Sequence, residues 1–181
     1  KEYGTMFKVY DDQDSGNICF GTEKDGQRYF VKFAGAPTEQ FGGDPADAIS
    51  RLKATLPIYS DLKHENLIEL IEAKEIGDGF AMVFKWADSD CMGRMYPAAH
   101  RRFMQLPIND RLAVFSDILS FLECVASRKY VAIDFYDGSI MYDFANGKTT
   151  ICDIDLFHKQ PCVNDMGRMW GSSRFQSPEE Y

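Results

Sequence analysis

The stretch YVAIDFYDGSIMYDFANGKTTICDIDLF, residues 130–157, decides the fold of this chain. Its apolar run 131–133 stops at Asp134, and its β-branched run 149–152 stops at Asp153. Such runs predict strands, and the segment 140–148 between them predicts a further strand and a hairpin turn. An acid directly after a buried strand is costly unless it binds a cation, accepts hydrogen bonds or forms an ion pair. The stretch therefore predicts a base or positioning acid near a metal-binding acid. The alternative is two hairpins with solvated acids.

The spacing of these acids resembles the catalytic segment of protein kinases, in which H-R-D-x-x-x-x-N precedes a hairpin and D-F-G. The resemblance implies that Asp134 is the catalytic acid. It also implies that Ser139 stands in place of the metal-binding Asn and that Asp153 binds the metal. The sequence departs from the kinase pattern at Ala132-Ile133, which replaces His-Arg, and at Asp155, which replaces glycine.

Three segments near the N-terminus, 6–10, 17–22 and 27–33, predict a β-meander. Gly16-Asn17-Ile18 resembles the last G-x-V of a kinase glycine-rich loop, and Lys32 resembles the lysine of V-A-I-K that holds nucleotide phosphates. The resemblance implies that Gly16, Ile18 and Lys32 bind ATP. Asp11 and Gln13 occupy the places of the first two glycines. Side chains there hinder the close approach of phosphate to the backbone, which argues against tight binding.

A helix over residues 46–54 is expected to begin at Asp44-Pro45, an N-cap followed by proline in the first turn. It takes the place of the kinase helix αC. No glutamate occupies the αC position near Thr55, and Asp47 is the substitute partner that we consider for Lys32. We expect His64, in a segment that resembles L-x-H-P-N-I-V, to be a structural capping residue.

Two further strands, 67–73 and 80–84, would complete a five-stranded sheet. Phe84 then resembles the kinase gatekeeper, which implies that adenine pairs with the main chain of Lys85 and Ala87. A strand followed by a surface loop explains the same residues equally well.

A helix over residues 111–127, capped by Asn109-Asp110, is predicted to lead into the catalytic segment. Residues 171–179 resemble the G-T-x-x-Y-x-A-P-E end of a kinase activation segment, with Ser172 at the threonine that hydrogen-bonds the catalytic Asp. A local basic cluster is expected to be a solvated face; its members are Lys85, Arg94, His100, Arg101 and Arg102.

The composition is that of an ordinary globular protein with a net charge of −8. That charge argues against non-specific binding to nucleic acid and to anionic membranes. Five cysteines without a C-x-x-C pair disfavour a disulfide framework, so a reducing, cytoplasmic compartment is expected. The sequence shows neither an apolar run of membrane-spanning length nor a signal-peptide pattern.

Together these motifs predict an α+β, protein kinase-like bilobal fold. The expected parts are a β-rich N-lobe over 1–84 with one αC-type helix, a hinge over 85–90, and a truncated, mainly helical C-lobe over 91–181. We expect a divergent serine/threonine protein kinase that uses ATP and Mg²⁺ and acts weakly on a protein. Expected partners are a protein substrate or a regulatory protein, and another copy of the chain if the chain ends at Tyr181.

Two alternatives remain open at this point. Ile133 replaces the arginine that senses activation-loop phosphate, and Tyr136 replaces the lysine near the γ-phosphate. Losing such electrostatic partners lowers the rate of phosphoryl transfer, so a pseudokinase scaffold is the first alternative. A small-molecule phosphotransferase of related fold is the second.

Overall fold

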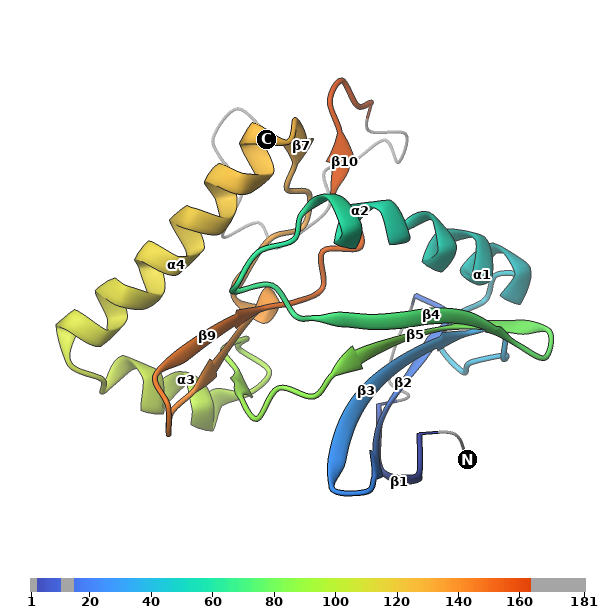
Figure 1. The fold of residues 1–181 in the computed structure, drawn as a ribbon, viewed down its shortest axis with the longest axis horizontal. Helices are drawn as coiled ribbons and strands as arrows, with labels where there is room; N and C mark the ends of the chain where they lie inside the picture. The colour runs from blue at the N-terminus through green and yellow to red at the C-terminus, as the bar shows by residue number, and fades with distance from the viewer. Residues whose placement is uncertain (1–2, 11–14, 164–181) are drawn as a thin grey trace. The chain divides into compact units, whose positions relative to one another are not determined.

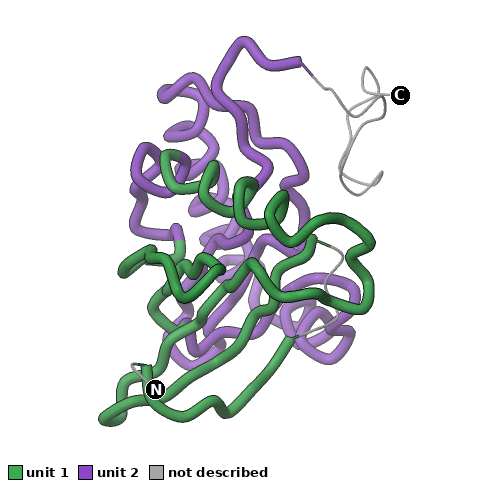
Figure 2. Tube along the Cα trace, turned by 90° about the vertical axis from the view of Figure 1, so that its right-hand side faces the viewer, with its two compact units in different colours: residues 1–57, 68–86 green, residues 58–67, 87–181 purple. Residues whose placement is uncertain are grey.

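The structure is a computed structural model that describes residues 3–10 and 15–163. The fold is α+β and divides into two compact units (Figures 1 and 2). Unit 1 comprises residues 1–57 and 68–86, and unit 2 comprises residues 58–67 and 87–181. None of the helices in the described part of the chain is long and apolar enough to cross a membrane.

Unit 1 contains a five-stranded antiparallel sheet in the order β1-β2-β3-β5-β4 (Figure 1). The strands are β1 (Thr5–Tyr10), β2 (Asn17–Lys24), β3 (Gln27–Ala34), β4 (Leu70–Ile76) and β5 (Gly79–Lys85). The predicted meander is therefore confirmed. The β2–β3 hairpin turns at Asp25-Gly26, where both residues have positive φ, as a two-residue type I′ turn requires.

The predicted bounds of the fourth strand, 67–73, are wrong by three residues. Leu67 forms an isolated parallel bridge with Ile151, and Ile151 N donates to Asn66 O at 2.6 Å. Both partners belong to unit 2. The apolar run that begins at Leu67 therefore serves two units, and only its second part enters the sheet.

Helix α1 (Pro45–Ala54) begins as predicted, because Asp44 Oδ1 accepts a hydrogen bond from Ala46 N at 2.9 Å. The helix packs on β3 and β5. Its residues Ala48 and Leu52 are buried, as is Ala34 of β3. A short helix, α2 (Leu56–Asp61), follows directly.

Unit 2 contains small antiparallel ladders and helices. The ladders are β6-β8-β9 and β7-β10, formed by β6 (Asp90–Cys91), β7 (Tyr130–Val131), β8 (Ile140–Asp143), β9 (Lys148–Ile151) and β10 (His158–Lys159). The helices are α3 (Pro97–Met104), α4 (Ile108–Ser127) and the 3-10 turn η1 (Asp137–Ser139). The predicted strand 131–133 is shorter than expected, because the chain leaves the ladder after Val131.

The predicted cap of α4 is wrong. The helix begins at Ile108 with Pro107 at the N-cap, and no side chain caps it. Asn109 and Asp110 lie in its first turn instead. Proline fixes φ and has no N–H to satisfy, so the helix starts directly after Pro107. Asp110 is well placed there, since an acid in the first turn complements the helix dipole.

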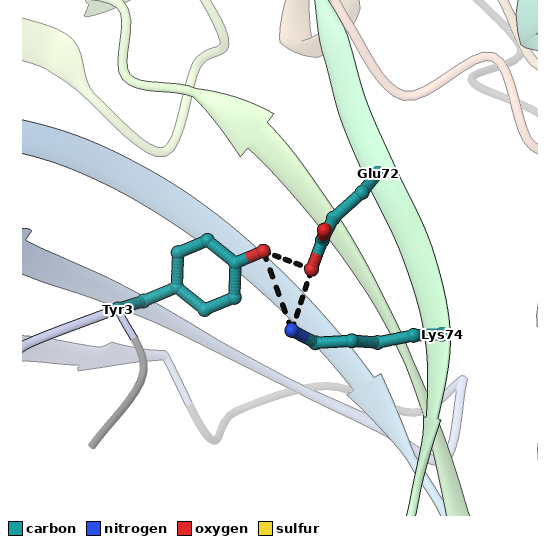
Figure 3. A network of polar contacts seen from close by, with 3 residues as sticks. All are labelled: Tyr3, Glu72 and Lys74. Atoms are coloured by element: carbon teal, nitrogen blue, oxygen red, sulfur yellow. Dashed lines mark hydrogen bonds and ion pairs between the residues drawn. The ribbon is translucent and has the colours of Figure 1, made fainter.

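A polar network ties Tyr3 to strand β4 (Figure 3). The Tyr3 hydroxyl donates to Glu72 Oε1, and Lys74 Nζ lies 2.5 Å from the same oxygen. The Lys74 ammonium also lies 4.6 Å from the centre of the Tyr3 ring. The hydrogen bonds from Lys74 and then Tyr3 lower the pKa of Glu72. The network therefore holds the start of the chain against β4.

We expect Tyr3→Phe to lower the free energy of unfolding by roughly 0.5–1 kcal/mol, because one hydrogen bond to a partly exposed carboxylate is lost. Urea titration measures this, with Tyr10→Phe, outside the network, as the control.

The stabilising contribution of Glu72 is predicted to depend on pH. Because its pKa is depressed in the folded state, the carboxylate adds to the free energy of unfolding above the usual glutamate pKa. This contribution is lost as the pH falls through the folded-state pKa. A stability gap between wild type and Glu72→Gln that widens on acidification would contradict this.

Candidate functional site

Lys32 lies in the interior strand β3, on the sheet face that α1 covers. In the ladder it pairs with Cys19 of β2 and Met82 of β5. Directly opposed residues point to the same face, and Met82 Sδ accepts a hydrogen bond from Thr55 Oγ1 just after α1. The helix-covered face therefore carries a lysine among apolar neighbours. The suggested partner, Asp47, is exposed in the first turn of α1, and its ion pair with Lys32 stays a prediction.

The ladder does not bring Ile18 to this face. Ile18 pairs with Phe33, the neighbour of Lys32, and successive strand residues point to opposite faces. Cys19, which is buried, lies beside Lys32 instead. Motif spacing missed Cys19 because the length of the β2–β3 hairpin sets which residue opposes Lys32.

Phe84 shares the face of Lys32 and is buried, paired with Phe30. The Lys85 amide donates to Glu69 O at 2.9 Å, so it is used within the sheet. Lys85 itself is exposed, and Ala87 follows half-buried. Gly16 is buried, but its neighbour is the ring of Phe41, which takes the space where the sequence predicts a phosphate. Adenine and phosphate binding by these residues stays a prediction.

In unit 2 both predicted acids adopt the same uncommon backbone conformation. Asp134 has φ 57° and Asp153 has φ 56°. This left-handed region costs most L-residues of order 1 kcal/mol and is tolerated best by Asn and Asp. Asp134 lies three residues after the end of β7, and Asp153 lies two residues after the end of β9.

Tyr136 links the two acids. Its pKa is raised to about 12, first by burial and then by the negative charges of Asp153 and Asp134. Both carboxylates must lie near the phenol to have this effect. A Cβ on Gly138 would overlap the Tyr136 ring, so the ring lies directly over that glycine. The arrangement places a neutral hydroxyl donor among acids at every physiological pH.

Ser139 is fully buried in this loop, at 0% exposure. Its carbonyl accepts a hydrogen bond from Cys152 N at 2.9 Å, which fixes it next to the chain that enters Asp153. Within the described residues, Ser139 Oγ has no hydrogen-bond partner. A buried hydroxyl left without a partner costs about 1–3 kcal/mol.

Cys91, which the sequence motifs did not indicate, borders the same loop. Its thiol donates to Gly138 O at 3.4 Å, and Gly93 N donates to its sulfur at 3.4 Å. Burial raises the pKa of this thiol, the Gly93 hydrogen bond opposes the rise, and Asp137 and Asp153 add to it. The thiol is therefore a neutral wall of the site rather than a nucleophile.

An aromatic cluster anchors the loop that carries Asp134. Phe135 packs against Phe121 of α4 and Phe157, with ring centres 6.3 and 6.2 Å away, and the latter two rings are 6.2 Å apart. Phe121 and Phe157 are 0% and 1% exposed. The cluster therefore joins the residue after Asp134 to the segment after Asp153.

Other predicted residues have structural roles. His64 accepts a hydrogen bond from Asn66 N through Nδ1, and its Nε2 lies 3.2 Å from Ser120 Oγ, so its role is structural; the predicted capping role stays a prediction. Asp155 accepts from the Tyr59 hydroxyl at 2.9 Å. In the basic cluster, Arg102 Nη1 lies 3.9 Å from Asp90 Oδ2. Lys85 belongs to unit 1, whereas the other members of the cluster belong to unit 2.

Ser172 and the rest of the motif at 171–179 lie outside the described residues. Within the described part, no group of three or more His, Cys, Asp or Glu side chains could hold a metal ion by itself. No protein-family model matches the chain, and no curated protein matches it significantly. The site must therefore be judged on its own chemistry.

We expect Phe121→Ala to lower the free energy of unfolding of unit 2 by about 3–5 kcal/mol, because it leaves a cavity in the cluster that holds the Asp134 loop. Phe115→Ala is the matched control, since Phe115 lies on the same helix at 56% exposure; its effect should stay within about 0.5 kcal/mol. Equal losses for the two variants in guanidinium titrations would contradict the anchoring role.

Proposed function

We propose that this chain is a divergent protein kinase-like transferase that moves a phosphoryl group from ATP to a serine or threonine hydroxyl of a protein. The observation that carries the proposal is the pair Asp134 and Asp153. Both follow strands, both have φ near +57°, and both act on one phenol, Tyr136. Strained acids that converge in this way are typical of functional sites.

The arrangement of each unit supports a kinase-like fold. In unit 1 the helix α1 comes after β3 and before the β4–β5 pair in the sequence. It covers the sheet face that bears the β3 lysine. In unit 2 the long helix α4 leads into β7, the Asp134 loop and the β8–β9 hairpin. This is the order that the kinase resemblance predicts.

Mg²⁺ fits the oxygen groups of unit 2. Asp153 offers an exposed carboxylate, and Ser139 offers a buried hydroxyl that lacks a hydrogen-bond partner among the described residues. Magnesium in phosphoryl-transfer sites uses one or two protein carboxylates and completes its shell with phosphate oxygens and water. When bound, it would neutralise charge on the transferring phosphates.

The residues of the chain then have distinct tasks. Lys32 would hold nucleotide phosphates by charge, as its place on β3 suggests. Asp134 would orient the acceptor hydroxyl and take its proton, which needs a carboxylate held in a fixed direction. The left-handed backbone at Asp134 and the anchor at Phe135 supply that direction. Tyr136 would donate a hydrogen bond without adding charge.

A nucleotide-free or nucleotide-binding scaffold is the second candidate. One observation favours it: the ring of Phe41 fills the space beside Gly16. In a scaffold, Asp134 would serve only to stabilise its own loop.

Asp134→Asn separates the two candidates. Asn accepts left-handed φ as readily as Asp, so folding should be preserved. If Asp134 is the proton acceptor, we expect at least a roughly 100-fold loss of phosphoryl transfer, with unchanged ATP affinity. The assay follows ³²P from ATP into a mixture of serine- and threonine-containing proteins.

Asp143→Asn is the matched control, because Asp143 lies in the same unit and caps the turn of the β8–β9 hairpin. It should leave the transfer rate unchanged. Equal and negligible transfer by wild type and Asp134→Asn would reject catalysis and leave the scaffold.

A further inference from the structure

Gly16 lies in close contact with an aromatic ring within unit 1. It has φ 79° and is buried. A Cβ built on Gly16 would lie 2.6 Å from Cδ1 of Phe41 and 2.9 Å from Cβ of Ala48 in α1. Only glycine allows the backbone to come this close to another group. The group that has come close here is an aromatic ring.

Phe41 is held in this position from several sides. Its ring also lies against Gly43, where an added Cβ would overlap it. The Arg51 guanidinium of α1 lies 4.9 Å from the ring centre, a cation–π distance. Arg51 Nη2 also donates to Ser15 O at 3.4 Å. The ring is therefore enclosed by the backbone before β2, by α1 and by its own loop.

The segment that carries Phe41 contains two adjacent glycines. It joins the end of β3 at Ala34 to the start of α1 at Pro45. Gly42-Gly43 follows Phe41 directly, and a Cβ on Gly42 would meet nothing within 4 Å. A glycine in open space, such as Gly42, permits large changes of φ and ψ. Phe41 can therefore leave without breaking β3 or α1.

A phosphate group and a phenyl ring cannot share the space beside Gly16. Backbone amides bind an anion only where nothing lies between them and the anion. If the ring left, the Arg51 guanidinium would still have Ser15 O as a hydrogen-bond acceptor. A guanidinium in that place presents several N–H donors that match phosphate oxygens.

We infer that Phe41 is an internal plug of a phosphate-binding subsite formed by Gly16 and Arg51, and that it competes with the phosphates of the nucleotide. The inference rests on the proposed function, since it assumes that the phosphates belong to ATP. Binding to a site that is open only part of the time is weakened by the open fraction. The plug therefore lowers the affinity of the chain for ATP.

The test compares wild type with Phe41→Ala by calorimetric titration of Mg²⁺-ATP, tripolyphosphate and adenosine. If the open form is about 10% populated, removing the ring tightens ATP and tripolyphosphate about tenfold. Adenosine carries no phosphate, so its affinity should not change. Phe41→Leu, which keeps part of the apolar volume, should give a smaller gain and covers the case in which Phe41→Ala does not fold.

Phe115→Ala is the control. Phe115 lies on α4 of unit 2 at 56% exposure, outside the residues assigned to nucleotide binding. It should leave all three affinities unchanged. If wild type and the Phe41 variants bind ATP equally tightly, Phe41 is not a plug, and the proposed function is unaffected. An equal gain for adenosine would also overturn the plug. If neither wild type nor any variant binds ATP or tripolyphosphate, both the proposed function and the plug are rejected.

Discussion

The packing of Phe135 between Phe121 and Phe157 is the constraint on which the candidate site depends. Phe135 is the neighbour of Asp134, and Phe157 lies four residues beyond Asp153. Both rings lean on one buried ring of α4. Because aromatic cores are close-packed, the loop and the segment after β9 cannot shift independently. The cluster thus fixes the backbone from which both acids project.

The chemistry of the site follows from this fixed backbone. Two acids in left-handed conformation would be an unexplained cost in a loop that only connects strands. Both acids raise the pKa of Tyr136, and the Ser139 hydroxyl is buried in the same loop. If a cation and a phosphate bind there, their binding energy would offset the cost of the two backbone conformations. In unit 1, Lys32 lies on the sheet face that α1 covers.

Local signals in the sequence predicted much of this arrangement. Asp44-Pro45 specified the start of α1, and the acids at strand ends marked Asp134 and Asp153. Features that depend on distant partners were not predictable in this way. The face of Ile18 depends on strand register, and the place of Phe41 depends on which side chain fills the space beside Gly16. Neither has a local signature, since any apolar residue of similar size satisfies the same pattern.

We propose that Lys32 of unit 1 binds nucleotide phosphate and that the Asp153 segment of unit 2 binds Mg²⁺. Hydrogen–deuterium exchange with and without saturating Mg²⁺-ATP tests it most directly, because it reports each unit separately. The account predicts slower exchange in peptides from β2–β3 and in peptides spanning residues 139–154. Asp153→Asn should remove the slowing of exchange in the peptides that span residues 139–154. Unchanged exchange in both regions of the wild-type chain would contradict the account.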